Sequence, residues 1–195
     1  MNPWAGDFGT EYAERNPPDL AGDTRFLDKA LFHLLINKVE VGSALEFGAS
    51  NGRNLLVLDN MFDCTLEAVE INPAACKTLR NHGIKTHECC MLGSGHYQAD
   101  LVVSKGVLIH TDPSDLERAY RVLHEATRKY LLIAEYFSPT PAKVDYRDGV
   151  GMWKRDFAGE FLDRYDMTVL DYGFVWNRDP YPQDNLSWFL LEKAR

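Results

Sequence analysis

Two kinds of apolar pattern alternate along most of the chain. Short runs rich in Val, Ile, Leu and Ala predict strands at residues 44–47, 65–69, 84–87, 99–104 and 130–135. Between these runs, helical spacing of apolar residues predicts helices over 51–60, 73–81 and 113–127. Two of the helices have a proline in the first turn, where its missing N–H costs least. Strands that alternate with helices in this way predict a mostly parallel sheet covered on both faces.

The N-terminal segment breaks this alternation. Residues 1–22 are rich in Gly, Pro, Asp and Asn. The Asn-Pro-Pro run at 16–18 cannot lie inside a helix, because proline lacks the N–H donor and clashes with the preceding turn. We therefore expect a loop or arm, followed by a helix whose N-cap is Asp23 or Thr24.

The C-terminal third changes the pattern again. A helix is expected over 154–165, followed by strand-like segments at 167–176 and 186–192. The connection between these two segments is rich in Pro, Asp and Asn, which predicts an antiparallel hairpin at one edge of the sheet. The chain of 195 residues shows no internal repeat, so we expect a single domain with an arm, 1–22, and a core, 23–195.

Composition and charge narrow the class of partner. The formal net charge of −8 opposes attraction to nucleic-acid phosphates and to anionic bilayers, so neither is expected as a partner. The purely apolar stretches are a few residues long, against the roughly 20 that a membrane-spanning helix needs. The first residues lack the features of a secretory signal, which favours a cytoplasmic protein. The cysteines have no disulfide or zinc spacing, so they are expected to be reduced and no metal is expected.

One turn carries the strongest chemical signal. The first predicted strand runs into a turn that contains Gly48, Ala49, Ser50 and Gly52. Glycine permits a tight turn and leaves room for a ligand against the backbone. The next strand ends on Glu70, where a ribose can be held through its two hydroxyls. A dinucleotide site is the close alternative, but the spacing G-x-G-x-x-G is absent because three residues separate Gly48 from Gly52.

This turn resembles a known motif. The segment 46–52, Glu-Phe-Gly-Ala-Ser-Asn-Gly, resembles the first motif of class I methyltransferases, an acid followed by G-x-G or G-x-x-x-G. Ser50 stands where the commonest form has its second glycine. The resemblance implies that the loop lies under the methionyl part of S-adenosyl-L-methionine and that Glu70 holds the ribose. It also implies that Glu46 orients the loop or reaches the cofactor's ammonium group.

Later segments fit the same superfamily. Residues 99–110 resemble its fourth-strand motif, whose carboxyl end faces the cofactor. By analogy the stretch 88–91 is expected near the adenine, where Glu88 either pairs with the amino group or is simply solvated. The expected cofactor contacts are Tyr12, Arg15, Glu46, Gly48, Ala49, Ser50, Gly52, Glu70, Ile71, Cys90, Met91, Lys105 and Gly106.

Nearly the whole chain is also similar to a narrower family, the pseudaminic acid biosynthesis-associated methylases. The similarity is carried by Trp4 and by the segments 8–16, 105–110, 135–139, 146–147, 153–157, 171–174 and 184–188. The two resemblances imply a Rossmann-like class I methyltransferase fold, α/β, with a seven-stranded mostly parallel sheet, helices on both faces and an antiparallel C-terminal hairpin. They imply S-adenosyl-L-methionine as cofactor, S-adenosyl-L-homocysteine as product, and N- or O-methylation of a small molecule, with an amino-sugar or nonulosonic-acid intermediate as candidate.

Three residues are candidates for the chemistry. Methyl transfer is a direct displacement, so alignment and desolvation supply much of the rate. His110 follows the fourth strand and fits a general base, although it equally fits a cap at the helix entry near Asp112. Glu135 is the other candidate base, and Tyr136 is expected to orient the acceptor. The residues expected to bind the substrate are Tyr146, Arg147 and Trp153.

The arm and two rival functions stay open. The segment 8–16 mixes aromatic, acidic and basic residues, which favours a lid over the cofactor, and packing across the sheet is the other interpretation. Arg15 fits a carboxylate of the cofactor or of the substrate. One rival is a cofactor-binding module without catalysis in a glycan pathway. The other is a nucleotide-sugar oxidoreductase, which would bind NAD and not S-adenosylmethionine. No oligomeric state follows from the sequence.

Overall fold

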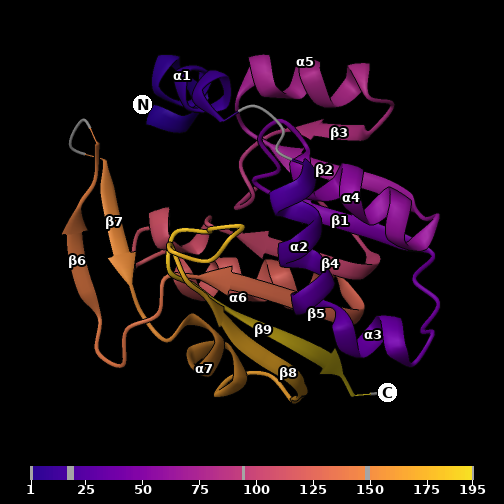
Figure 1. The fold of residues 1–195 in the computed structure, drawn as a ribbon. Coiled ribbons are helices and arrows are strands. Elements are labelled where there is room, and N and C mark those ends of the chain that lie inside the picture. Colours follow the sequence, from indigo (N-terminus) through magenta and orange to yellow (C-terminus); the bar gives the residue numbers. More distant parts are fainter. Residues whose placement is uncertain (1, 17–19, 94, 148–149, 195) are drawn as a thin grey trace.

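A seven-stranded sheet forms the centre of the molecule (Figure 1). The computed structural model describes residues 2–16, 20–93, 95–147 and 150–194. In the order β3-β2-β1-β4-β5-β9-β8, the first five strands are parallel and β9 is antiparallel to both neighbours. The strands are β1 (Ser43–Phe47), β2 (Thr65–Glu70), β3 (Lys85–Glu88), β4 (Ala99–Lys105), β5 (Thr127–Glu135), β8 (Met167–Val175) and β9 (Leu186–Lys193). The predicted sheet and its antiparallel C-terminal hairpin are confirmed.

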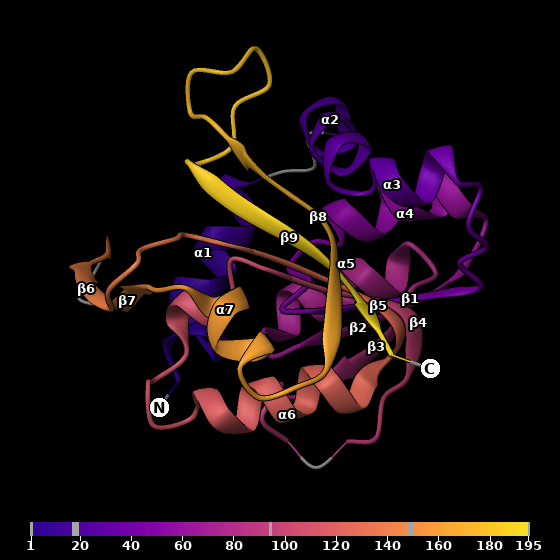
Figure 2. The same cartoon turned by 90° about the horizontal axis from the view of Figure 1, so that it is seen from below.

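Helices cover both faces of this sheet (Figure 2). They are α2 (Leu20–Ala30), α3 (Phe32–Ile36), α4 (Arg53–Phe62), α5 (Pro73–Asn81), α6 (Leu116–Ala126) and α7 (Phe157–Leu162). Helices α2 to α4 bury residues such as Phe26 and Leu55 against one face, and α6 and α7 bury Tyr120 and Phe161 against the other. Burial of each such side chain contributes about 1.5–3 kcal/mol, so the two layers hold the strands and their loops in place.

The N-terminal arm is helical, which corrects the expectation of a loop. It contains a 3-10 turn, η1 (Pro3–Ala5), and helix α1 (Asp7–Arg15). Part of the proline run at 16–18 lies outside the described residues, and α2 begins at Leu20. Asp23 therefore lies inside the helix and is not its N-cap. Its carboxylate instead pairs with Arg53 of α4.

A small hairpin between β5 and α7 was not predicted. Strands β6 (Ala142–Asp145) and β7 (Gly151–Lys154) pair with each other and form a separate two-stranded sheet. Their sequences are short and mixed in polarity, so they carry no clear period. The helix expected over 154–165 is shorter than predicted, because α7 begins only after Asp156, whose side chain accepts the N–H of Gly159 as an N-cap.

The topology concentrates loops at one edge of the sheet. The strand order reverses between β1 and β4, and the carboxyl ends of the parallel strands meet on that side. Open α/β sheets bind their ligands at such a switch point. Helix α1 and the β6–β7 hairpin gather around the same edge (Figure 1). Within the described part of the chain, no helix is long and apolar enough to cross a membrane.

Candidate active site

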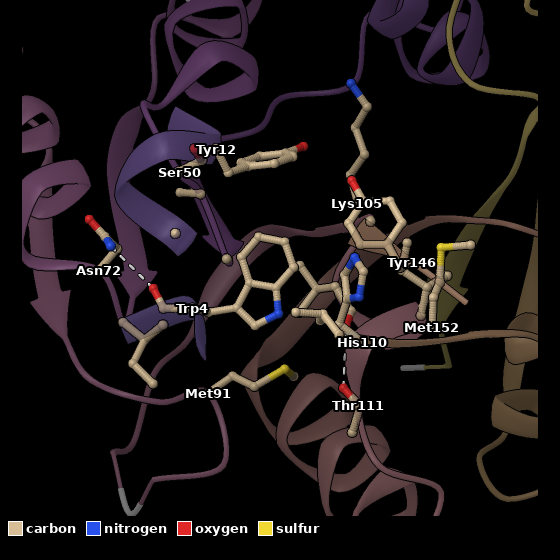
Figure 3. Close-up of a pocket in the computed structure, with 18 of the residues that line it drawn as sticks. Trp4, Tyr12, Ser50, Asn72, Met91, Lys105, His110, Thr111, Tyr146 and Met152 are labelled. Carbon is tan, nitrogen blue, oxygen red and sulfur yellow. Dashed lines mark hydrogen bonds between the residues drawn. The ribbon is translucent and has the colours of Figure 1, made fainter. Parts of the chain in front are cut away.

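A cavity of about 1400 Å³ opens at this edge of the sheet. The carboxyl ends of β1, β2 and β4 form its floor, and the arm, the β6–β7 hairpin and the loop after β8 form its walls. Figure 3 shows side chains from these distant segments pointing into one space. The volume falls at or above the upper end of small-molecule pockets, so it accommodates a cofactor together with a small second ligand.

The glycine turn forms a bent loop on the cavity floor. Gly48, Ser50 and Gly52 all have positive φ, at 67°, 48° and 78°. Gly48, Ala49 and Ser50 line the cavity, as expected. Gly52 does not, because it begins α4 and faces the core, where an added Cβ would lie 2.7 Å from Leu79 Cδ2. Gly52 therefore packs against the core at the start of α4, whereas the sequence indicated a direct cofactor contact.

Gly48 is tightly constrained by its surroundings. A Cβ built at Gly48 would lie 2.5 Å from Val107 Cγ2, and the φ of 67° is strained for any L side chain. We expect Gly48→Ala to lower the free energy of unfolding by about 1–3 kcal/mol, measured by urea denaturation. Gly151→Ala is the matched control, because that position has open space and should change stability by less than about 0.5 kcal/mol. Equal midpoints for both variants would contradict this description of the loop.

The carboxylate of Glu70 joins two cofactor-side loops. Its Oε2 accepts the N–H of Ser50 at 2.8 Å, and its Oε1 accepts the N–H groups of Ile71 and Asn72, each at 2.8 Å. The side chain is 7% exposed and lines the cavity, and Ile71 lines it as well. Because a carboxylate has about four acceptor positions, these three bonds leave capacity for a hydroxyl of a ligand.

Glu46 has a buried oxygen without a partner. Its Oε1 accepts a hydrogen bond from Asn54 at 2.6 Å, whereas no described residue bonds its Oε2. The residue lines the cavity and is 2% exposed. Burial raises the pKa of Glu46 to about 8, against the lowering effects of Asn54 and of the Lys105 charge. An unpaired carboxylate oxygen at a cavity wall fits a bound cation or an N–H donor.

A charge network supports this carboxylate. Lys105 Nζ lies 3.3 Å from Asn54 Oδ1 and 3.5 Å from Asp23 Oδ1. Arg53 holds the same Asp23 carboxylate with two bonds, at 2.7 and 3.1 Å. Burial lowers the pKa of Lys105, and the opposing charge of Asp23 acts against that shift. Arg53, Asn54 and Lys105 all line the cavity, although only Lys105 was predicted.

The third-strand side of the cavity is less polar. Cys90 and Met91 line it as expected, together with Leu92. Glu88 is not among the lining residues, and its carboxylate pairs with Arg80 at 2.9 Å on an exposed surface. This geometry agrees with the solvated alternative for Glu88. Within the described ranges, His, Cys, Asp and Glu do not gather in any group of three or more that could hold a metal ion.

His110 lies in an aromatic group on the opposite wall. It ends a 3-10 turn, η2 (Leu108–His110), and its ring centroid lies 4.6 Å from that of Trp4 and 5.1 Å from that of Tyr146. Its Nδ1 lies 3.3 Å from the carbonyl oxygen of Gly151 in β7. Burial lowers the pKa of His110, so the imidazole is neutral near pH 7.

Glu135, the other candidate base, does not line the cavity. Its Oε1 accepts the N–H groups of Val107 and Leu108 at 3.0 and 2.9 Å, and its Oε2 accepts that of Ile109 at 3.4 Å. Burial raises its pKa to about 7, while these N–H groups act in the opposite direction. The hydroxyl of Ser104 also donates to Oε1, at 3.4 Å, so the carboxylate accepts four hydrogen bonds and holds the turn that carries His110.

The outer wall carries the expected substrate-side residues. Tyr136, Tyr146, Arg147 and Trp153 all line the cavity, with Lys143 as an additional cation. Burial raises the pKa of Tyr136, and the charge of Asp184, from the loop after β8, raises it further. Lys154 lies over the Tyr136 ring, 5.5 Å from its centroid. The wall therefore combines aromatic faces with charges of both signs.

The arm is attached directly to the cofactor-side loops. Asn72 Nδ2 donates to the carbonyl oxygens of Trp4 and Gly6, each at 3.2 Å (Figure 3 shows the first of these bonds). Asn51 Nδ2 donates to the carbonyl oxygen of Ala13 at 2.7 Å. Tyr12 and Arg15 line the cavity as predicted. The arm thus forms a wall of the cavity, and Asn72, which the sequence did not single out, anchors it.

Comparison with solved structures identifies the fold. The chain is similar to 1,6-didemethyltoxoflavin-N1-methyltransferase of Burkholderia thailandensis, solved with S-adenosylhomocysteine, at 17% identity and TM-score 0.73 over 97% of this chain and 86% of the other. It is also similar to magnesium protoporphyrin IX methyltransferase of Synechocystis, solved with S-adenosylhomocysteine as well. Here the identity is 11% and the TM-score 0.73, over 98% of this chain and 96% of the other. The similarity to the N-methyltransferase NodS of Bradyrhizobium japonicum has 15% identity and a TM-score of 0.67, over 89% of this chain and 97% of the other.

These similarities show which fold the chain has, but they do not assign it to a protein family. No family model matches the chain, and no curated protein matches it significantly by sequence. At identities of 17% and below, the shared feature is the fold. The protein has the Rossmann-like fold of these methyltransferases, which confirms the predicted fold class.

Proposed function

We propose that the protein is an S-adenosyl-L-methionine-dependent methyltransferase acting on a small polar molecule. The observation that carries this proposal is the unpartnered Oε2 of Glu46, buried at the cavity wall beside the glycine loop. S-adenosylmethionine carries an ammonium group on its methionyl part, and that group would supply the missing partner. The neighbours of known structure include enzymes solved with S-adenosylmethionine or its product, on the same fold.

The described residues fit the whole cofactor. Glu70 would accept the ribose hydroxyls, because its carboxylate retains acceptor capacity and faces the cavity. Gly48, which has no side chain, would leave the backbone accessible to the methionyl part, and Ser50 lines the cavity next to it. Ile71, Cys90 and Met91 would enclose the adenine with mostly apolar surface. The bound group supplies an electrophilic methyl on a sulfonium, and the protein supplies alignment and exclusion of water.

The opposite wall would bind the acceptor. His110 is the only one of the two proposed bases that lines the cavity, so we assign proton removal to His110 and the positioning of its turn to Glu135. Tyr136 would orient the acceptor from the wall next to Asp184. Arg147 and Lys143 provide cations for an anionic group, and Tyr146 and Trp153 provide faces for a ring. An amino-sugar or nonulosonic-acid intermediate has this combination of a ring, polar groups and an acid.

Cofactor affinity should depend on pH through Glu46. Burial raises its pKa to about 8 in the free protein, and an ammonium group against Oε2 would lower it again. At pH values between the pKa of Glu46 in the complex and its pKa in the free protein, binding releases a proton. The affinity for S-adenosylhomocysteine should therefore rise with pH by at most about tenfold per pH unit and level off above about pH 8. Calorimetry from pH 6 to 9 measures this slope. Glu46→Gln should bind more weakly at pH 8 and with little slope, whereas an unchanged slope in that variant would exclude Glu46.

Turnover tests the catalytic part of the proposal. The purified protein would be incubated with S-adenosylmethionine and a panel of amino sugars and sugar acids, and formation of S-adenosylhomocysteine would be measured. Product from one of these acceptors supports a methyltransferase. Binding of the cofactor without transfer to any acceptor would favour a cofactor-binding module without catalysis.

A further inference from the structure

The indole nitrogen of Trp4 is a buried donor without an acceptor. Across the described segments, no hydrogen-bond partner lies within reach of Trp4 Nε1, although the atom is shielded from solvent. Trp4 lines the cavity, and Figure 3 shows its indole next to the imidazole of His110. Buried N–H groups are nearly always paired in folded proteins, so an unpaired one on a side chain that lines a cavity indicates a ligand that brings an acceptor.

The surroundings hold Trp4 in one place. Its backbone N–H donates to Asn2 Oδ1 at 3.0 Å, and its backbone carbonyl oxygen accepts from Asn72 Nδ2 at 3.2 Å. The ring makes edge contacts with Phe8 and Tyr12, at centroid distances of 4.9 and 5.3 Å. A donor fixed in this way binds an acceptor without first losing conformational freedom.

His110 supplies the complementary acceptor. The carbonyl of Gly151, 3.3 Å from His110 Nδ1, can only accept, so in the neutral imidazole Nδ1 carries the proton and Nε2 keeps its lone pair. The two rings lie 4.6 Å apart between centroids. Two neighbouring rings that line the cavity therefore carry an N–H donor and an unprotonated ring nitrogen.

We propose that Trp4 and His110 together bind a hydroxyl group, and that the protein is therefore an O-methyltransferase. This inference rests on the function proposed above and selects its acceptor atom. A hydroxyl has two lone pairs and one proton: one lone pair accepts from Trp4, the proton points to His110, and the second lone pair attacks the methyl group. A neutral amine has one lone pair, which a bond from Trp4 would occupy, and an ammonium group has none to accept with.

The transfer balances with these groups alone. The new O–CH₃ bond forms as the CH₃–S bond of the sulfonium breaks, and the electron pair of the broken bond stays on sulfur. The hydroxyl proton moves to His110 Nε2, and the imidazolium releases it to water after the products leave. The Trp4 N–H stabilises the partial negative charge that develops on the acceptor oxygen during this step.

A panel of matched acceptors tests the proposal. Cofactor binding is first established with S-adenosylhomocysteine, because its absence would be a failure of the proposed function and not of this inference. The probes are N-acetylneuraminic acid and the pairs glucose with glucosamine and galactose with galactosamine, and products are identified by mass spectrometry and NMR. We expect methyl ethers. Methylation on nitrogen would overturn the proposal.

Trp4→Phe tests the donor directly, because it keeps an aromatic ring and removes the N–H. We expect kcat/KM for the hydroxyl acceptor to fall about 10- to 100-fold, with unchanged affinity for S-adenosylhomocysteine. Trp176→Phe is the matched control, since Trp176 is exposed and does not line the cavity, and it should behave as wild type. Equal kcat/KM for Trp4→Phe and wild type would overturn the proposal.

A second readout does not depend on turnover. In protein labelled with ¹⁵N-tryptophan and saturated with S-adenosylhomocysteine, the Trp4 indole resonance is assigned by its loss in Trp4→Phe. Hydroxyl probes should move this resonance, and the changes should exceed those from the amine member of each pair. If no probe moves it and no probe is methylated by a protein that binds the cofactor, the proposal is wrong.

Discussion

Replacing Glu70 with alanine is expected to raise the Kd for S-adenosylhomocysteine by at least about 100-fold. The variant loses the carboxylate that faces the ribose position, and a hydrogen bond to a charged group contributes about 1.5–3 kcal/mol. It also leaves the N–H groups of Ser50, Ile71 and Asn72 without their acceptor, so the two loops lose their common anchor. Isothermal calorimetry measures the change.

Glu67→Ala is the matched control for this prediction. Glu67 lies on the same strand, but its carboxylate pairs with Lys85 and His87, each within 3.0 Å, and it does not line the cavity. Its Kd should stay within about twofold of wild type, because a surface ion pair contributes little. Circular dichroism shows that both variants are folded. If a folded Glu70→Ala protein binds as tightly as wild type, the cofactor is not held at the end of β2.

Replacing His110 with alanine is expected to lower kcat about 100- to 1000-fold once an acceptor is known, as for loss of a general base. Affinity for S-adenosylhomocysteine should be unchanged, because His110 is on the wall opposite Glu70. Burial lowers the pKa of His110, so wild-type kcat should be flat near neutral pH and fall only below about 6.5, where the imidazole gains its proton. The variant should lack this acidic limb.

His124→Ala is the control for the His110 prediction. His124 lies in α6 outside the cavity lining and stacks on Tyr165 with ring centroids 4.2 Å apart, and burial lowers its pKa as well. Its kcat and pH profile should match wild type. A His110→Ala protein with undiminished kcat and an intact acidic limb would remove this residue from the mechanism, and alignment alone would then account for the rate.

The sheet could be predicted because its determinants are local. Parallel strands such as β4 and β5 are buried on both faces, so they read as continuous apolar runs. The glycine turn and the end of the strand at Glu70 could likewise be predicted, because each depends on residues that are adjacent in the sequence. Their convergence at one edge follows from the topology, which is why most expected cofactor contacts lie in one cavity.

The arm and the role of Glu135 could not be predicted in this way. Asn51 and Asn72 attach the arm that contains helix α1, and both residues are far from it in sequence. These hydrogen bonds form only in the folded protein, so the local sequence of the arm does not show them. Glu135 was expected as a candidate base beside His110. Its carboxylate accepts hydrogen bonds from the backbone N–H groups of residues 107–109. Every residue type except proline carries such an N–H group, so the sequence does not show which of them point toward Glu135.

Calorimetric titration of the wild-type protein with S-adenosylhomocysteine, with NAD as the comparison ligand, tests the central claim most directly. The geometry of Glu46, the glycine loop and Glu70 predicts one site per chain with a Kd on the order of micromolar, about −8 kcal/mol, and no measurable binding of NAD. A folded protein that ignores S-adenosylhomocysteine, or that binds NAD more tightly, would contradict the assignment as a methyltransferase.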